Sequence, residues 1–404
     1  MNRIAITGIG IVSTLGNDTD TVSKALYTGK SGITVDPERQ ALGFSSPLTG
    51  AIRDFAPVPA LGRKQRKTMP DFAVWAFAAA MEALTMSGLD PHELKNDRTG
   101  LIFGSDSSSI AAIEQVELLQ KRGQTSLIGS GLVFRAMTSC VTMNLNTLFG
   151  TKGACWTLSS ACASGGQAVG QAADLIALGR QDRVICGGVQ EINWQSICSF
   201  DGLGAFSTRA DDPARASRPF DRNRDGLVPS GGAAVILLEN MDMAKARGAR
   251  ILGEVLAHGF SSDGENLSVP SRGGLARAMR AALNNANLTT ADIDYICAHA
   301  TATPAGDGVE AWNIRDVFGA TTPTISSTKS MTGHELWMSG ASQVVYTTLM
   351  ARDGFIAPSI NFDQPDDDTA GLAITPETIE RAPRTAMCNA AGFGGTNSCL
   401  ILRF

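Results

Sequence analysis

The chain has 404 residues, of which 43% are hydrophobic and 18% are charged, and its formal net charge is −5. This length and composition predict a globular protein with a large buried core, built as two domains or as one duplicated unit. The acidic balance argues against a general nucleic-acid-binding protein, because such proteins present a basic surface. Eight cysteines without a CxxC pair predict neither a disulfide framework nor a zinc site, and no apolar run is long enough to cross a membrane. We therefore expect a cytoplasmic protein without a bound metal.

Short β-branched runs alternate with alanine-rich segments along the whole chain, which is the pattern of an α/β fold. We predict strands, parallel at the centre of their sheets, at residues 3–11, 99–103, 183–186, 233–238, 293–298, 324–326 and 398–402. After Met241 the segment "RILGEVLAHGFSSDG" opens a second strand-and-helix series, as "RIAITGIGIVSTLG" opens the first. The sequence thus predicts an internal duplication, with loops inserted at residues 35–70 and 208–232.

Two glycine-rich turns need separate interpretation. Gly8 and Gly10 follow the first strand as in a dinucleotide-binding motif, but Ser13 occupies the position of the third glycine. No acidic residue ends a second strand at the expected distance, so we exclude a nicotinamide cofactor. The turn in "CNAAGFGGTNSCLIL" is compatible with a phosphate cradle or a simple turn, and we favour the turn.

Cys162 lies in "LSSACASGGQ", where an apolar β-like run gives way to an alanine- and glycine-rich helix. At the N-terminal end of a helix, unpaired N–H groups and the helix dipole favour a thiolate over a thiol and can also bind an oxyanion. The other cysteines are expected to be buried and inert, as free cysteines usually are. Cys162 is therefore the predicted nucleophile.

Two of the four histidines stand in chemically rich surroundings. His299 follows an apolar strand in "YICAHATATPAGDGVE", and His334 follows another in "ISSTKSMTGHELW", which also contains Lys329. Ligand sites in α/β proteins gather at the carboxyl ends of strands, so we predict that these residues share a reaction centre. His92 and His258 are expected to be structural.

Six segments, in this order and spacing, resemble the β-ketoacyl-[acyl carrier protein] synthases, the condensing enzymes of fatty-acid and polyketide synthesis within the thiolase-like superfamily. The segments are "TGIGIVSTLGN", "SSACASG", "SRPFDRNRDGLVPSGGAAVILLE", "HATATPAGDGVE", "TKSMTGHELWMSGA" and "GFGGTN". The resemblance covers essentially the whole chain and is strongest to the type I bacterial synthases. It implies a homodimer and a five-layered αβαβα fold of two similar halves, which we divide at residues 1–250 and 251–404.

The resemblance implies a decarboxylative Claisen condensation without any cofactor. Cys162 would take an acyl chain from acyl carrier protein as a thioester, with the oxyanion held by the N–H groups of Cys162 and Phe393. Neutral His299 and His334 would bind the thioester oxygen of malonyl-loaded carrier protein while carbon dioxide leaves. The enolate that forms would then attack the acyl group on the cysteine.

Further positions take roles from the same resemblance. Lys329 would be a buried cation paired with Glu310 that orients the histidine loops. The substrate-binding positions implied are Thr301, Thr303, Asp307, Ala391 and Asn397. The two threonines match positions that hydrogen-bond the pantetheine arm of the carrier, whereas the aspartate and the asparagine match supporting positions.

Carrier proteins of this family are strongly acidic, so an acidic enzyme must meet them with a local basic patch. The motif "GRKQRK" provides one, and a second basic pair follows later in the chain: the residues are Arg63, Lys64, Arg66, Lys67, Lys121 and Arg122. Without the resemblance, an ordinary solvated charged turn would be the simpler interpretation.

Four positions depart from the family pattern. Ala300 replaces a usual glycine, Ala391 replaces a usual phenylalanine, and Trp337 and Met338 stand where small residues are usual. These changes leave the acyl length and saturation open. The pathway is therefore either fatty-acid elongation or a specialised polyene or polyketide route of the aryl-polyene type, in which the chain could pair with a chain-length partner.

Other functions fit the motifs less well. A biosynthetic thiolase would use a second cysteine near the C-terminal glycine turn, where this chain has Phe393. A non-catalytic chain-length partner typically lacks the nucleophile, whereas Cys162 and both histidines are present. A cysteine hydrolase would leave His299 or His334, and also Lys329, without a role.

Overall fold

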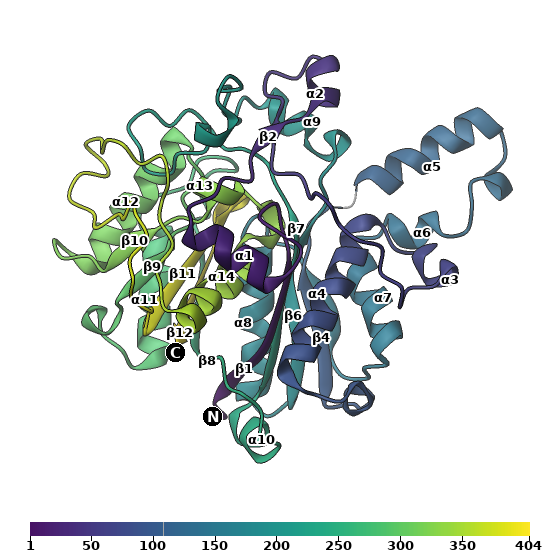
Figure 1. The fold of residues 1–404 in the computed structure, drawn as a ribbon, viewed down its shortest axis with the longest axis horizontal. Coiled ribbons are helices and arrows are strands. Elements are labelled where there is room, and N and C mark those ends of the chain that lie inside the picture. Colours follow the sequence, from purple (N-terminus) through teal and green to yellow (C-terminus); the bar gives the residue numbers. More distant parts are fainter. Residues whose placement is uncertain (108) are drawn as a thin grey trace.

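The computed structural model describes residues 1–107 and 109–404, which fold into alternating layers of helices and sheet (Figure 1). In these residues ten strands form one hydrogen-bonded sheet in the order β10-β9-β11-β12-β8-β1-β7-β6-β4-β5, and β2 (Thr34–Val35) and β3 (Leu48–Thr49) form a separate pair. Five strands belong to the first half of the chain: β1 (Ile4–Val12), β4 (Thr99–Gly104), β5 (Cys155–Leu158), β6 (Arg183–Gln190) and β7 (Gly232–Asn240). The other five are β8 (Gly253–Ser262), β9 (Tyr295–Cys297), β10 (Thr324–Ser326), β11 (Thr385–Gly392) and β12 (Thr396–Arg403).

The two sets of strands repeat one topology. In the order β1-β7-β6-β4-β5 the first two pairings are antiparallel and the last two parallel, and β8-β12-β11-β9-β10 shows the same sequence of pairings. Residues 4–6 of β1 pair with residues 253–255 of β8 and join the two sets. The prediction of two similar halves is confirmed, and the division at residues 250 and 251 stays a proposal that this repeat supports. The prediction of parallel centres is wrong in part, since each middle strand has one antiparallel neighbour.

Helices cover both faces of each half and fill the space between the halves. The outer layer of the first half is α4 (Asp71–Ser87) and α7 (Cys140–Phe149), and that of the second half is α11 (Gly274–Ala286) and α12 (Pro304–Phe318). The central layer is α8 (Ser164–Ala177) and α14 (Ser339–Asp353), flanked by α1 (Thr19–Tyr27). This arrangement confirms the predicted αβαβα order.

Small residues let the two central helices approach each other closely. A Cβ atom added at Gly340 of α14 would lie 2.4 Å from the backbone nitrogen of Gly166 in α8, a separation that a real side chain cannot adopt. The glycine at position 340 of α14 is therefore explained by helix–helix contact. This contact fixes how the first half of the chain lies against the second.

Further helices lie in the connections between these elements. They are α2 (Pro37–Ala41), α3 (Arg63–Arg66), α5 (Ser109–Arg122), α6 (Leu132–Arg135), α9 (Trp194–Gly202), α10 (Met241–Ala246), α13 (Lys329–Thr332), and the 3₁₀ turns η1 (Pro91–Leu94), η2 (Thr125–Leu127), η3 (Pro213–Arg215), η4 (Thr290–Asp292), η5 (Leu336–Met338) and η6 (Phe393–Gly395). Helix α5 projects from the body of the first half (Figure 1). Among the residues described, no helix has both the length and the apolar character needed to cross a membrane.

Candidate active site

Cys162 lies in a tight turn between β5 and α8. The turn is closed by Ser164, whose hydroxyl accepts a hydrogen bond from the Ser160 N–H at 2.8 Å and donates one to the Ala161 carbonyl at 2.6 Å. Ala161 has a φ of 47°, in the left-handed region that a residue with a Cβ rarely adopts. This strained turn places Cys162, which is 5% exposed, on the wall of a cavity of about 410 Å³.

The expectation that the helix start would favour a thiolate is wrong for the resting protein. Burial raises the pKa of the Cys162 thiol to about 12. The Lys329 cation and the N–H groups of Cys162 and Phe393 act in the opposite direction, and Asp106 adds to the rise. The helix start therefore offsets only part of the desolvation, and the cysteine rests as a thiol.

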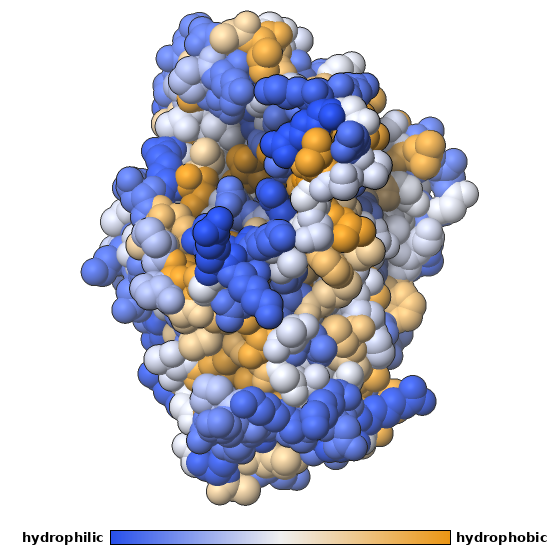
Figure 2. Space-filling view, turned by 90° about the vertical axis from the view of Figure 1, so that its right-hand side faces the viewer, coloured by the Kyte–Doolittle hydropathy of each residue, from blue (hydrophilic) through white to orange (hydrophobic). Residues whose placement is uncertain are grey.

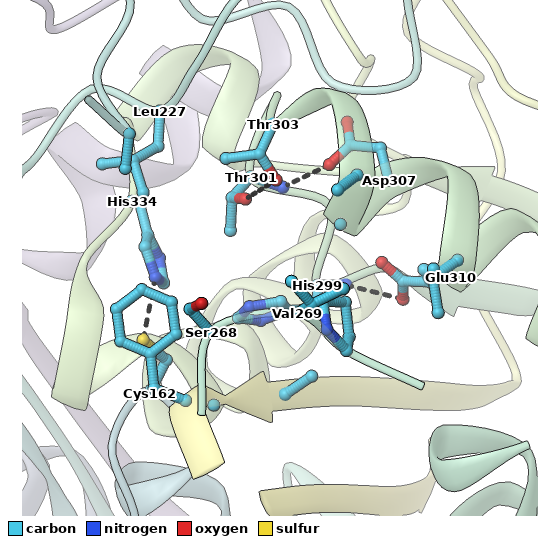
Figure 3. A pocket seen from close by; sticks show the side chains of 18 of the residues that line it. Cys162, Leu227, Ser268, Val269, His299, Thr301, Thr303, Asp307, Glu310 and His334 are labelled. Carbon is cyan, nitrogen blue, oxygen red and sulfur yellow. Dashed lines mark hydrogen bonds between the residues drawn. The ribbon is translucent and has the colours of Figure 1, made fainter. Parts of the chain in front are cut away.

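His334 is the direct neighbour of the thiol. Its backbone is fixed to the segment before β7, because its N–H donates to the Val228 carbonyl at 2.7 Å and its carbonyl accepts from the Ser230 N–H at 2.9 Å. The ring Nε2 lies 3.1 Å from Sγ of Cys162 (Figure 3), and Nδ1 lies 3.2 Å from the Ser339 hydroxyl. In the described part of the chain that hydroxyl has no other acceptor, so it donates to Nδ1 and leaves the ring hydrogen on Nε2.

His299 follows β9 and faces His334 across the cavity. The two ring centroids are 5.3 Å apart and the rings are almost perpendicular, at 88°. The loop that carries His299 is held by Glu310 of α12, whose carboxylate accepts from the His299 N–H at 2.9 Å and from the Ala300 N–H at 2.6 Å (Figure 3). Cys162 thus comes from the first half of the chain and both histidines come from the second.

Both imidazoles are neutral. Burial lowers the pKa of His299 and of His334 well below the usual value, and the nearby Lys329 cation lowers both further. A neutral imidazole can donate a single N–H to an oxygen without changing its charge. The pair therefore offers two uncharged donors to one cavity.

The expected ion pair between Lys329 and Glu310 is not present. Among the residues that the structure describes, Lys329 makes no salt bridge, and Glu310 instead binds the two loop N–H groups and the Asn389 amide. Burial lowers the pKa of Lys329, and nearby Cys297, Glu335 and Glu310 oppose that shift. Lys329 acts on the site as a buried positive charge at a distance.

The two threonines line the cavity on the side of α12. Their hydroxyls lie 3.2 Å apart, and the Thr301 N–H donates to Asp307 Oδ1 at 3.0 Å (Figure 3). Asp307 also accepts from the N–H groups of Phe220 and Ala302. Burial raises the pKa of Asp307 to about 7 despite these donors. Asp307 therefore shapes the loop that presents Thr301 and Thr303.

The C-terminal glycine turn closes the cavity from another side. Ala391, Phe393 and Asn397 all line the cavity, and the Asn397 amide donates to Asp263 at 2.8 Å and to the Gly395 carbonyl at 3.0 Å. The Phe393 ring is 37% exposed and stacks on Phe200 with centroids 5.9 Å apart. The C-terminal glycine segment therefore forms a turn that places the Phe393 ring on the cavity wall.

Sequence reasoning missed several residues around this site. Phe200 of α9 stacks on Phe393, and Ser339 contacts His334. Glu335 is a buried carboxylate that accepts from Ser342 at 2.6 Å and from the Tyr346 hydroxyl. A glutamate after a glycine turn gives no sequence signal of burial, and a serine at the start of a helix is normally a simple cap. The residues described include no group of three or more His, Cys, Asp or Glu side chains that could hold a metal.

The predicted basic patch lies away from the cavity on the first half. Helix α3 carries three of its members on an exposed surface, and Lys67 directly follows it and donates to the Ser130 hydroxyl at 2.9 Å. Lys121 and Arg122 end α5, and both are exposed. The six cations are therefore available to a partner from solvent, but they do not line the cavity.

Comparisons with known proteins agree on one family. The chain matches the family models "Beta-ketoacyl synthase, N-terminal domain" over residues 1–244 and "Beta-ketoacyl synthase, C-terminal domain" over residues 252–363. It is 42% identical over 407 residues to the 3-oxoacyl-[acyl-carrier-protein] synthase 1 of Haemophilus influenzae and 40% identical over 407 residues to that of Escherichia coli K12, covering 100% of this chain and 99% of each relative.

Solved structures show the same likeness. A beta-ketoacyl synthase from Burkholderia phymatum STM815 is 34% identical with a TM-score of 0.94 over 100% of this chain and 99% of that one. A ketosynthase solved with its type II polyketide acyl carrier protein is 27% identical with a TM-score of 0.89, again over 100% and 99% of the two chains. The full-length match to these models and relatives shows that the chain belongs to the β-ketoacyl synthase family.

Proposed function

We propose that this protein is a β-ketoacyl-[acyl carrier protein] synthase that extends acyl chains by decarboxylative condensation with malonyl-loaded carrier protein. The observation that carries the proposal is the shared cavity in which the sulfur of Cys162, the Nε2–H of His334 and the ring of His299 meet. A nucleophile with two neutral donors suits a reaction that forms first a thioester and then an enolate.

In the first half-reaction Sγ of Cys162 attacks the thioester carbonyl of an acyl carrier. The oxyanion that forms accepts hydrogen bonds from the N–H groups of Cys162 and Phe393, the same two groups that act to lower the pKa of the thiol. The carbon–sulfur bond to the carrier then breaks, and the departing pantetheine sulfur ends with the proton that the cysteine gave up. The result is an acyl group on Cys162 and a free carrier thiol.

In the second half-reaction a malonyl carrier takes the place of the first. The N–H groups of His299 and His334 bind its thioester oxygen, so the electron pair released when the carboxylate leaves as carbon dioxide is held as an enolate. The enolate carbon attacks the acyl carbonyl on Cys162, forms the new carbon–carbon bond and releases the cysteine sulfur. The sulfur takes up a proton from solvent, and the β-ketoacyl product remains on the carrier.

The acidic carrier would dock on the basic patch formed by α3, Lys67 and the end of α5. The carrier protein named with the ketosynthase of 27% identity supports such a partner. Opposite charges at an interface raise the rate of encounter more than the affinity. The exposed cations of α3 therefore favour recruitment without blocking the cavity.

A second copy of this chain would pair at the open edge of the sheet. Strand β5 ends the strand order, and Trp156 on it is 40% exposed. Exposed apolar residues also lie on α5, η2 and α6: Val116, Leu119, Leu127, Val133 and Phe134. Figure 2 shows the side of the molecule that lies to the right in Figure 1, where orange apolar groups stand among blue ones. An exposed edge strand with apolar neighbours is the kind of surface that proteins cover by association.

The fatty-acid pathway is favoured over the polyene alternative. The relatives of 40–42% identity are named 3-oxoacyl-[acyl-carrier-protein] synthase 1, and a Vibrio harveyi relative of 34% identity is named synthase 2. No residue of the described site requires a chain-length partner, because Cys162, His299 and His334 all lie on this one chain.

Intact-protein mass spectrometry tests the proposal. The protein is incubated with an acyl-loaded carrier and then with a malonyl-loaded carrier, and the mass added to the enzyme and the β-ketoacyl product on the carrier are measured. We expect acylation of Cys162 followed by extension, and no acylation of a Cys162→Ala variant. Condensation by that variant, or full decarboxylation of malonyl carrier by both a His299→Ala and a His334→Ala variant, would contradict the assignment.

A further inference from the structure

An aromatic wall lies against the nucleophile. Cys162, Leu336 and Trp337 form one buried apolar cluster, against which the partly buried Phe200 packs. The Trp337 ring lies 6.2 Å from the Phe200 ring, tilted by 51°, and its Nε1–H donates to the Ser107 hydroxyl at 3.3 Å. Because Trp337 is only 6% exposed, its indole fills the space beside the cysteine.

The turn that carries Trp337 cannot retreat from this position. A Cβ atom added at Gly165 would lie 2.9 Å from the Met338 carbonyl oxygen, and one added at Gly188 would lie 2.9 Å from the Met338 Cα. The backbone of η5 therefore rests directly on α8 and β6, and Leu336 takes a left-handed φ of 44° within it. Only rotation of the indole, with loss of its contacts to Phe200 and Ser107, could free the space it occupies.

The cavity next to Cys162 has two chemically different sides. Thr301 and Thr303 supply hydroxyls where α12 begins, and Phe200, Leu336 and Phe393 supply apolar surface beside Cys162. On the proposed function, the polar arm of the incoming carrier needs the side with hydroxyls. The alkyl tail of an acyl group on Cys162 must then lie against the apolar side, where Trp337 stands behind Leu336 and Phe200.

We propose that Trp337 limits the length of the acyl group that Cys162 accepts, so that this synthase condenses short acyl chains. A short chain fits in the open cavity against Phe200 and Leu336. A longer chain has to displace the indole, which costs the hydrogen bond to Ser107 and the packing on Phe200. This inference rests on the proposed function and names the substrate class of the same site.

The test compares two acyl lengths on the wild-type protein and on Trp337 variants. Carrier protein loaded with hexanoyl or with tetradecanoyl groups is mixed with the enzyme, and the rate of acylation of Cys162 is followed by mass spectrometry. We expect the wild-type protein to take hexanoyl at least about ten-fold faster, since apolar pockets discriminate chains by such factors. In Trp337→Ala the tetradecanoyl rate should rise about ten-fold while the hexanoyl rate stays within about three-fold.

Two further variants separate pocket size from loss of stability. Trp337→Leu removes less volume and should shift the preference in the same direction if the alanine variant folds poorly. Phe77→Leu trims an aromatic residue that stacks on Phe149 at 5.7 Å in the outer helix layer, and it should leave the preference unchanged. Equal wild-type rates for the two chains, or an unchanged preference in the Trp337 variants, would overturn the inference while the proposed function stands. Acylation by neither carrier would overturn both.

Discussion

Replacing Glu310 by glutamine tests how the structure positions one histidine. The buried carboxylate binds the His299 N–H with one oxygen and the Ala300 N–H with the other. Glutamine retains one carbonyl oxygen but turns an NH₂ group toward the second N–H, which leaves that buried donor unpaired. Hydrogen bonds to a charged group contribute about 1.5–3 kcal/mol each, so we expect a loss of about 2–3 kcal/mol in holding the loop. If that loss appears in the transition state, the rate falls roughly 30- to 150-fold.

The two half-reactions distinguish this role from general damage. On the proposed function, His299 serves the decarboxylation step and not thioester formation at Cys162. Glu310→Gln should therefore slow malonyl decarboxylation strongly, while acylation of Cys162 stays within about two-fold. Glu254→Gln, which removes a buried carboxylate that pairs with the exposed Arg3 and does not line the cavity, is the matched control and should change neither rate. Equal losses in both half-reactions, or no loss in either, would refute the reasoning.

Three further outcomes are expected. Lys64→Glu should raise KM for the acyl carrier several-fold at unchanged kcat, and the effect should shrink as salt screens the patch; a salt-independent effect would argue against docking there. Ser339→Ala should lower decarboxylation several-fold and show mixed tautomers in ¹⁵N spectra of His334, and threonine should restore both; a pure Nε2–H tautomer in the alanine variant would contradict the assigned hydrogen bond. Burial lowers the pKa of His258 from 6.5 to about 4, so on acidification the unfolded chain binds a proton at this histidine before the folded chain does. The free energy of unfolding should therefore be highest above pH 6.5 and fall by about 2 kcal/mol by pH 5. His258→Gln should remove that loss in urea titrations whereas His92→Gln, at an exposed histidine, should keep it; identical pH profiles for both variants would show another group is responsible.

The order of elements could be predicted because it depends on local pattern. Residues 233–238, "AAVILL", form a short continuous apolar run typical of a buried strand, and they became β7, which is one residue longer at the start and two at the end. Strand β11 was not predicted, because "TAMCNAAG" is composed mainly of small residues with weak β preference. This segment forms a strand because it pairs with β9 on one side and β12 on the other, and such contacts between distant parts of the chain cannot be read from local sequence.

The identity of the site residues could be predicted more readily than their charges. Motif spacing placed Cys162, His299 and His334 on loops after strands, and the fold brings them into one cavity. The charge state of Cys162 depends on how much water the surrounding side chains exclude, which no local pattern contains. Local pattern also could not show that Lys329 lacks an ion pair with Glu310, because the Glu310 carboxylate binds backbone N–H groups that only the folded loop brings to it.

The contact between Gly166 and Gly340 limits which positions of this enzyme can change without moving the site residues. Helix α8 begins just after the nucleophile and α14 begins just after His334, so the distance from sulfur to imidazole is decided where the two helices cross. A single methyl group at Gly340 would push α14 away from α8 and lengthen that distance, although Gly340 lines no part of the cavity. Changes of substrate range therefore have to arise in the surrounding turns, such as η5, while the crossing itself tolerates no added atom.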